Sequence, residues 1–280
     1  MMRFLVLLAL CFSALSTPAL AAQGAKESAF DRVMRTGTLR CAYGLTGKFV
    51  FKDTTTNEVK GVMPDIISAL AESMGLEVEW TAEVGYADFA EGLKTGRYDA
   101  FCGALSETPA RARVAAFTSP LFFIAYYVWG REGEDRFKNE NDINKADVRT
   151  ATTDGEVFQS ITKKHFPTAK EHSLPNMTEP SLLYVSVSDG KADVVVHDSW
   201  NISLYNAANQ KKKLKKLFDK PLELYPAGFA VAPGQQDLLN ALNTGILSLI
   251  SLEKIDVILD KWGAPPSAIY RPMKPFDVVK

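Results

Sequence analysis

An arginine follows a run of small residues in the segment GALSETPARARVAAFTSP, which spans residues 103–120. The planar fork of Arg111 can donate two parallel, charge-assisted hydrogen bonds to a carboxylate, and the hydroxyl of Ser106 can donate another. Both residues follow a predicted buried strand at residues 99–105, and ligands of open α/β sheets bind at the carboxyl ends of strands. The alternative is an arginine solvated on a helix face. The segment therefore favours a site that captures a small carboxylate.

Alternating strands and helices must position these side chains. In the first half the hydrophobic pattern predicts strands at residues 39–43, 77–81 and 99–105, with helices at 63–74 and 86–94. In the second half it predicts strands at residues 148–152, 192–197 and 228–232, and helices at 153–164, 181–189 and 236–262. Such alternation is typical of an α/β fold with mainly parallel sheets. Trp262, just ahead of Gly263, is expected to anchor the core rather than to contact a ligand.

Four segments carry a resemblance to a known family. They are Thr38-Leu39-Arg40-Cys41-Ala42-Tyr43, Gly61-Val62-Met63-Pro64-Asp65-Ile66, Leu93-Lys94-Thr95-Gly96-Arg97-Tyr98-Asp99-Ala100 and Phe117-Thr118-Ser119-Pro120. In this order and spacing the chain resembles the periplasmic solute-binding proteins of amino-acid ABC transporters, bacterial extracellular solute-binding protein family 3. The resemblance implies the two-lobe, type II periplasmic binding fold, in which each lobe is a mainly parallel sheet flanked by helices.

The same resemblance implies the domain boundaries. The first lobe would comprise residues 22–126 and 228–280, and the second lobe residues 127–227. Two crossings, near residues 125–130 and 224–228, would form a two-strand hinge that lets the lobes close like jaws.

By the resemblance, Ala104 and Ser106 fall on two small ligand-contacting positions and Arg111 on the carboxylate-binding arginine. Ala104 stands where a serine is often found, so we expect only a backbone contact there. The stretch Asp189-Gly190-Lys191-Ala192-Asp193 resembles the approach to an amine-binding aspartate, which here is Asp198. Asp198 can instead cap the helix that Ser199 and Trp200 begin. We favour the amine role, because Arg111 supplies the complementary end of a zwitterion.

Aromatic side chains and a helix start complete the candidate site. Tyr86 occupies the position of an aromatic wall in the family, and Tyr43 and Phe49 are further candidates, although such aromatics more often lie in a core. The segment Thr153-Asp154-Gly155-Glu156 has the spacing of a capping box, and the free N–H groups there can bind a carboxylate. The family usually has a Gly-Thr or Thr-Thr pair instead. Asp154 would bind a cationic side chain if it faces the cleft, and would only complement the helix dipole if it faces out.

The first residues predict export. Arg3 precedes an apolar run at residues 4–15, and Ala19-Leu20-Ala21 supplies a small-x-small cleavage site, so residues 1–21 are expected to be a cleavable signal peptide. The mature protein should then be periplasmic. Removing the signal leaves Cys41 and Cys102, which could form a disulfide in an oxidising compartment, although the required geometry cannot be read from the sequence.

Composition excludes other classes. The net charge of −1 gives no general attraction to nucleic acid, and the basic cluster at residues 211–216 is expected to be a solvated helix end. The three histidines have no metal-ligand spacing, so we expect no metal and no cofactor.

We therefore expect a monomeric, non-catalytic receptor that closes on an amino acid and delivers it to the permease of an ABC transporter. One alternative is an enzyme on the same scaffold, since cyclohexadienyl and arogenate dehydratases resemble these binders and fold does not settle function. Glu156, Glu179 or His197 would then be candidates for the general acid. Another alternative is a receptor for a non-amino organic acid that uses Arg111 and not Asp198.

Overall fold

The structure, a computed structural model, describes residues 27–272. The predicted signal peptide at residues 1–21 lies outside this part of the chain. No helix within residues 27–272 is long and apolar enough to cross a membrane.

Three parallel strands form the sheet of the first lobe. Strand β1 (Thr38–Tyr43) pairs in parallel with β4 (Glu77–Glu83) on one side and with β5 (Ala100–Ser106) on the other. Helix α2 (Val62–Ser73) buries its apolar face, including Leu70, against this sheet. It begins after Gly61, whose φ of +135° favours glycine and whose added Cβ would lie 2.4 Å from the carbonyl oxygen of Phe49.

The second lobe repeats this arrangement. Strand β8 (Arg149–Thr153) pairs in parallel with β9 (Lys170–Leu174) and with β10 (Val194–Asp198). Helices α6 (Val157–His165), α7 (Pro180–Ser188) and α8 (Ser199–Ala208) lie beside this sheet. The mainly parallel sheets predicted for both lobes are thereby confirmed.

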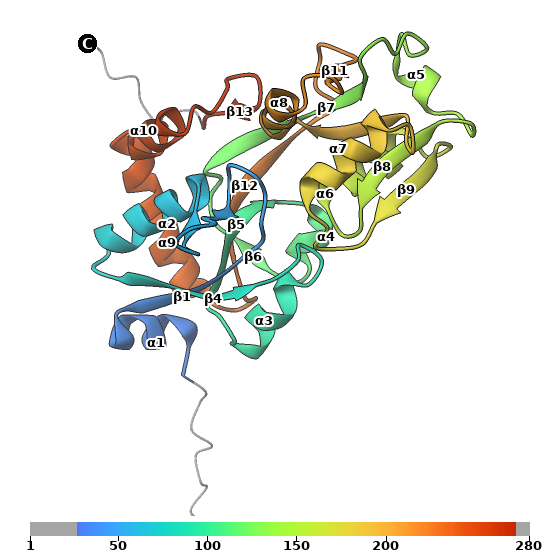
Figure 1. The fold of residues 1–280 in the computed structure, drawn as a ribbon. Coiled ribbons are helices and arrows are strands. Elements are labelled where there is room, and N and C mark those ends of the chain that lie inside the picture. Colours follow the sequence, from blue (N-terminus) through green and yellow to red (C-terminus); the bar gives the residue numbers. More distant parts are fainter. Residues whose placement is uncertain (1–26, 273–280) are drawn as a thin grey trace, which may run out of the picture.

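Two long strands connect the lobes. Strand β7 (Phe122–Arg131) pairs antiparallel with β10, β12 (Glu223–Val231) pairs antiparallel with β5, and the two pair with each other. The hydrogen-bonded order is β4-β1-β5-β12-β7-β10-β8-β9, so one continuous sheet runs through both lobes (Figure 1). These two strands cover the crossings expected near residues 125–130 and 224–228.

In each lobe a buried aspartate precedes one strand and binds an arginine of a neighbouring strand. Asp99, before β5, accepts a hydrogen bond from the backbone N–H of Arg40 (2.8 Å) and pairs with its guanidinium. Asp193, before β10, accepts from the backbone N–H of Arg149 (2.8 Å) and pairs with three arginines. Burial raises the pKa of Asp193, but hydrogen bonds from Arg136 and Arg149 outweigh it and lower the pKa to about 2. The Asp193 carboxylate therefore stays ionised, and each of the two aspartates links neighbouring strands.

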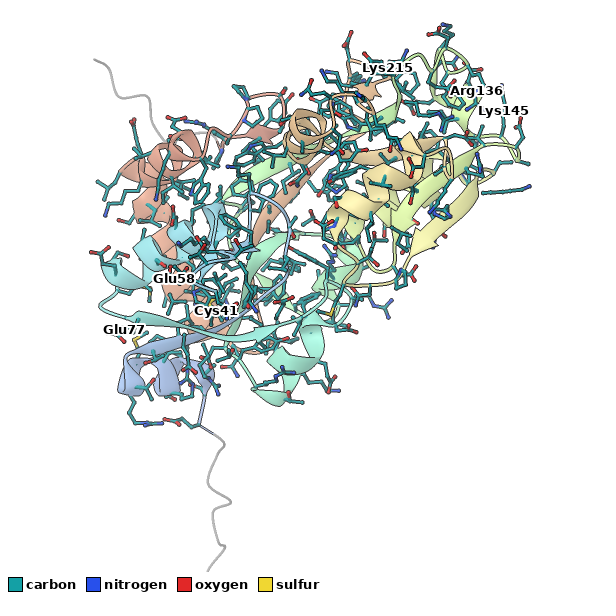
Figure 2. The ribbon with its side chains drawn as sticks, viewed as in Figure 1. Cys41, Glu58, Glu77, Arg136, Lys145 and Lys215 are labelled. Atoms are coloured by element: carbon teal, nitrogen blue, oxygen red, sulfur yellow. A yellow bond between two sulfur atoms is a disulfide. The ribbon has the colours of Figure 1, made fainter. Side chains whose placement is uncertain are left out.

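A disulfide links Cys41 on β1 to Cys102 on β5, with the two Cα atoms 5.6 Å apart. The sequence left this bond open, and the pairing of β1 with β5 explains it, because that pairing brings the two cysteines onto neighbouring strands. Figure 2 shows Cys41 inside the first lobe, while Arg136, Lys145 and Lys215 lie at the far end of the second lobe.

The carboxyl-terminal segment differs from its prediction. The expected single helix at residues 236–262 is two helices, α9 (Gln236–Ser251) and α10 (Lys254–Lys261), because Glu253 adopts a positive φ of +57° that interrupts the helix. Trp262 does anchor this end: its indole N–H donates to Asp65 (2.7 Å) and its ring packs edge-on against Phe51.

The basic cluster at residues 211–216 is not a helix end. It forms a turn and strand β11 (Leu214–Lys216), and ion pairs hold Lys212 to Asp189 and Lys215 to Asp135. The remaining elements are α1 (Ala29–Thr36), β2 (Phe51–Lys52), β3 (Val59–Lys60), α3 (Phe89–Thr95), α4 (Pro109–Ala112), β6 (Ala116–Phe117), α5 (Glu140–Ile143) and β13 (Ile269–Tyr270).

Candidate ligand-binding site

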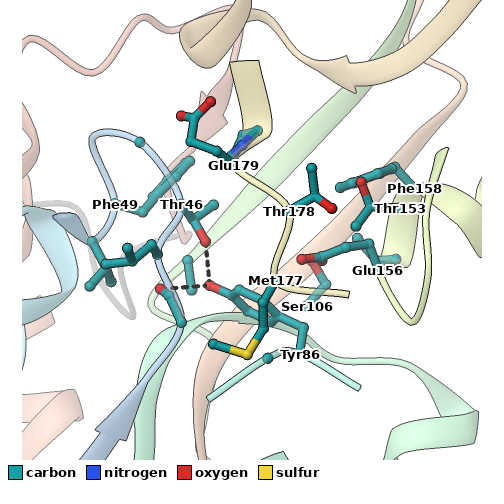
Figure 3. A pocket seen from close by; sticks show the side chains of 18 of the residues that line it. Thr46, Phe49, Tyr86, Ser106, Thr153, Glu156, Phe158, Met177, Thr178 and Glu179 are labelled. Atoms are coloured by element: carbon teal, nitrogen blue, oxygen red, sulfur yellow. Dashed lines mark hydrogen bonds between the residues drawn. The ribbon is translucent and has the colours of Figure 1, made fainter. Parts of the chain in front are cut away.

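A cavity of about 490 Å³ lies between the lobes, at the carboxyl ends of β1, β5, β8 and β10. This volume is within the usual range for small-molecule sites. Figure 3 shows Thr46, Tyr86, Ser106 and Glu156 around the same space. Seven of the nine residues expected to bind ligand line the cavity: Phe49, Tyr86, Ala104, Ser106, Arg111, Thr153 and Asp198.

Arg111 projects from the short helix α4, whose first turn is capped by the hydroxyl of Thr108. Its Nη1 donates to the carbonyl oxygen of Ser106 (3.0 Å) and its Nη2 to that of Gly155 in the other lobe (3.1 Å). Burial lowers the pKa of Arg111, and the nearby Glu156 carboxylate opposes that shift. An arginine remains charged even so, and about three of its five N–H donors remain for a ligand carboxylate.

Ser106 ends β5 beside the guanidinium. Its hydroxyl lies 3.1 Å from that of Tyr126 on β7, and both residues are buried. Burial raises the pKa of Tyr126 well above its usual value, so the phenol stays neutral. Either hydroxyl can donate the hydrogen bond between Tyr126 and Ser106. Ala104, two residues earlier on the same face of the strand, contributes a small surface to the cavity.

Asp198 ends β10 and is both a helix cap and part of the cavity wall. It accepts hydrogen bonds from the backbone N–H of Asn201 (2.9 Å) and from its side-chain amide (2.9 Å), and lies 2.8 Å from Nδ1 of His197. Burial raises the pKa of Asp198, but the hydrogen bonds from His197 and Asn201 outweigh burial and hold the pKa below its usual value. The carboxylate is therefore ionised. Its role as a helix cap does not exclude the expected role in binding a ligand amine.

Tyr86 forms an aromatic side of the cavity. The predicted helix at residues 86–94 begins later, at Phe89, so Tyr86 lies in the loop before it. Its hydroxyl lies 2.6 Å from that of Thr46, and the Arg111 guanidinium lies over its ring, 5.9 Å from the centroid. Phe49 lines the cavity where its ring packs edge-on against Trp200 of α8.

Two expected residues lie outside the cavity lining. The ring of Tyr43 packs edge-on against Trp80, with centroids 5.5 Å apart, and Tyr43 does not line the cavity. Asp154 is exposed and accepts hydrogen bonds from Gln159 and Ser173. Of the two orientations that the sequence left open for Asp154, the structure has the outward one.

Glu156 is a cavity residue that the sequence suggested only as a general acid of the enzyme alternative and not as a ligand-binding residue. The predicted capping box is wrong: Gly155 adopts a φ of +81°, α6 begins one position after Glu156, and the Glu156 side chain makes no capping hydrogen bond. Its carboxylate instead lines the cavity. Burial raises the pKa of Glu156 to about 7, against the opposing effect of Arg111 and His197. An acid next to a glycine at a strand–helix junction is the sequence signal that could have identified it.

Two further charged residues that line the cavity, Lys52 and Glu179, already have partners. Lys52 lies 3.1 Å from Glu83, and the Glu179 carboxylate accepts from the backbone N–H of Ser181 (2.8 Å) at the start of α7. Within residues 27–272 no cluster of three or more histidine, cysteine, aspartate or glutamate side chains is placed to hold a metal ion.

Known proteins share this architecture. The model of the family "Bacterial extracellular solute-binding proteins, family 3" matches residues 41–265. The amino-acid-binding protein AabA of Dichelobacter nodosus is 24% identical over 204 residues, which are 72% of this chain and 78% of that protein. A probable amino-acid ABC transporter-binding protein of Haemophilus influenzae is 24% identical over 234 residues, 80% of this chain and 86% of its own length.

Among solved structures, one similar protein is the ancestral amino acid-binding protein AncCDT-1, described as a precursor of cyclohexadienyl dehydratase. It is 26% identical with a TM-score of 0.73, and the match covers 84% of this chain and 99% of that one. The family match spans most of the residues that build both lobes and the cavity between them. The chain belongs to the bacterial extracellular solute-binding proteins, family 3.

Proposed function

We propose that the protein is a receptor that binds a free α-amino acid between its lobes and delivers it to the permease of an ABC transporter. The observation that carries this proposal is the half-buried Arg111 guanidinium in the same cavity as the ionised Asp198. An α-amino acid offers the complementary carboxylate and ammonium. The names of the relatives from Dichelobacter and Haemophilus support the ligand class, and the second also supports the transporter.

Each end of the ligand has a partner in this proposal. The α-carboxylate binds the free N–H groups of Arg111 and the hydroxyl of Ser106. The α-ammonium binds Asp198, whose two oxygens can accept about four hydrogen bonds, of which three are already formed. Tyr86 packs against the ligand, and Ala104 and Thr153 contribute smaller contacts.

Closure of the lobes would trap the ligand. We propose that residues 22–126 with 228–280 and residues 127–227 move as two bodies about β7 and β12. Arg111 belongs to the first body and Asp198 to the second, so a ligand bound to both favours the closed state. Export by the predicted signal peptide would place this monomeric receptor in the periplasm.

Isothermal titration calorimetry tests the proposal. Protein freed of co-purified ligand by unfolding and refolding is titrated with the common amino acids, and a circular dichroism spectrum together with a cooperative melt confirms refolding. We expect one amino acid, or a chemically related group, to bind with one-to-one stoichiometry. Refolded protein that binds none of them would refute the proposal.

The raised pKa of Glu156 favours an enzyme as the second candidate. A carboxyl with a pKa of about 7 keeps part of its proton at neutral pH and can act as a general acid on a leaving hydroxyl. The similarity to a precursor of cyclohexadienyl dehydratase directs this idea to prephenate and arogenate, which lose water and carbon dioxide to give aromatic products. Incubation with either compound, followed by absorbance, separates the two functions, since a receptor forms no aromatic product.

A further inference from the structure

An acid without an ion-pair partner lines the cavity. Glu156 caps no N–H of α6, and none of the ion pairs between the described residues includes it. The proposed contacts to an amino acid use Arg111 and Asp198 and leave Glu156 unexplained. Burying an ionised carboxylate without a compensating charge is costly, so the group must keep a proton or receive a positive charge from elsewhere.

The other charges of the cavity do not supply this compensation. Arg111 and Asp198 offset each other, and the backbone groups of an α-amino acid are themselves neutral in sum. At the mouth, Lys52 is already paired with Glu83 (3.1 Å). An ionised Glu156 therefore leaves one negative charge unbalanced when the lobes close around a zwitterion.

The groups that face Glu156 come from several elements, and most have fixed charge near neutral pH. Arg111 stays positive, hydrogen bonds keep the pKa of Asp198 low, and burial raises the pKa of the three nearby tyrosines. His197 is a further titratable neighbour, and its Nδ1 lies 2.8 Å from Asp198. Arg111, His197, Tyr86, Tyr126 and Tyr184 interact electrostatically with Glu156. The other charged residues that line the same cavity are Asp198, Lys52, Glu83 and Glu179.

Resting on the proposed receptor function, we propose that Glu156 selects amino acids with a cationic side chain, and that binding such a ligand expels the proton of Glu156 to solvent. The ammonium or guanidinium of the ligand then takes the place of that proton against the carboxylate. A neutral amino acid binds with Glu156 protonated and releases no proton. The site thus distinguishes ligands by net charge through one side chain.

Matched ligand pairs test the selectivity by calorimetry at pH 8. The pairs are arginine with citrulline and lysine with norleucine, which differ chiefly in side-chain charge. We expect the cationic member to bind about 10- to 100-fold more tightly, as for a hydrogen bond to a charged partner. In Glu156→Gln this preference should disappear. Asp154→Asn is the matched control, because Asp154 lies two residues away and is exposed outside the cavity.

Proton release is measured by repeating the titration at pH 7 in phosphate and in Tris, whose enthalpies of protonation differ. We expect release of about half a proton per cationic ligand, since the pKa of Glu156 is about 7. The affinity for cationic ligands should fall as the pH drops from 8 to 5, by up to about tenfold per pH unit. Glu156→Gln should abolish the release and flatten this dependence.

The outcomes distinguish failure of this proposal from failure of the receptor function on which it rests. If no amino acid binds, the receptor function fails and this inference fails with it. If amino acids bind but the wild type shows no cationic preference and no proton release, only the role of Glu156 is refuted. The same holds if Glu156→Gln keeps both properties. The proton release of the wild type decides the matter even if the variant does not fold.

Discussion

At the scale of the residue, Arg111 connects the two lobes through one side chain. Two of its N–H donors are fixed by backbone carbonyls, those of Ser106 and Gly155, on opposite sides of the cavity. These contacts orient the planar guanidinium, so little freedom is lost when it binds a carboxylate. A lysine offers a compact charge on a flexible stem and cannot hold both carbonyls in this geometry.

Arg111→Lys should therefore weaken amino-acid binding although it keeps the positive charge. We expect Kd to rise about 100-fold, because a bidentate pair becomes a single contact. Calorimetry measures the change, and Arg113→Lys is the control, since Arg113 is exposed and outside the cavity lining. Equal affinities for Arg111→Lys and the wild type would show that Arg111 does not bind the ligand carboxylate in two-pronged geometry.

Glu107 is a second residue with an unusual carboxyl. It lies between β5 and α4, its backbone N–H donates to Pro226 on β12 (2.8 Å), and its buried Oε1 has no hydrogen-bond partner. Burial raises the pKa of Glu107 to about 7. The folded state therefore keeps the proton above the unfolded pKa near 4.5, and this group destabilises the fold progressively as the pH rises from about 4.5 to 7.

Glu107→Gln should remove that penalty. At pH 8 we expect the variant to be more stable by about 1 kcal/mol, a value discounted for the part of Glu107 that solvent reaches. At pH 4.5 the two proteins should be nearly equally stable, since the wild-type carboxyl is then protonated in the folded state. Urea denaturation at both pH values measures the difference. A stability change that is the same at pH 4.5 and pH 8 would contradict this account.

The sequence could predict those site residues that directly follow regular strands. Ser106 and Asp198 end β5 and β10, so strand patterns alone put them at one edge of the sheet. Glu156 was not among the predicted ligand-binding residues, because a local spacing rule assigned the acid to a helix cap. The left-handed turn at Gly155 instead shifts the start of α6. Asp154 faces out for the same reason. The left-handed turn at Gly155, rather than the helix propensity of the segment, decides that Glu156 and not Asp154 lines the cavity.

At the scale of the element, the long periodic segments were predictable and the interruptions were not. Five of the six predicted strands and the helix at residues 63–74 agree with the structure to within two positions. The strand predicted at residues 228–232 covers only the end of β12, and the pattern did not predict β7 or β9 as strands. The tail helix was wrong because Glu253 takes a positive φ, which the residue type disfavours and only packing can impose. The short helix α4, which presents Arg111, is also too brief to leave a periodic pattern.

The disulfide between β1 and β5 should contribute to stability through the unfolded state. It links residues 61 positions apart, and the entropy of closing a loop of this size predicts a contribution of roughly 4 kcal/mol. We expect the double variant Cys41→Ser/Cys102→Ser to lose about this much free energy of unfolding, measured by urea denaturation. Reductant should destabilise the wild type to a similar extent and leave the double variant unchanged. A wild type indifferent to reductant would show that the bond adds no stability.

At the scale of the whole molecule, the two lobes pack so closely at one contact that glycine leaves no space for a side chain. The Asn176 side chain of the second lobe donates to Asp88 of the first (2.7 Å). A Cβ added to Gly85 would lie 2.4 Å from the Asn176 side chain, and one added to Gly155 would lie 2.4 Å from Ala87. Glycine on both surfaces thus allows the close approach that encloses the cavity.

Gly85→Ala tests whether this approach is needed for binding. Gly85 does not adopt a positive φ, so alanine adds a methyl group without backbone strain, and we expect the melting temperature of the ligand-free protein to stay unchanged. The methyl group should oppose closure and weaken ligand binding about tenfold, with a smaller ligand-induced decrease in the radius of gyration by X-ray scattering. In the double variant with Asn176→Ala the obstructing side chain is gone, so Gly85→Ala should cost much less affinity there than in the wild-type background. Equal losses in both backgrounds would mean that the methyl group acts within its own lobe, and closure at this contact would then have no part in binding.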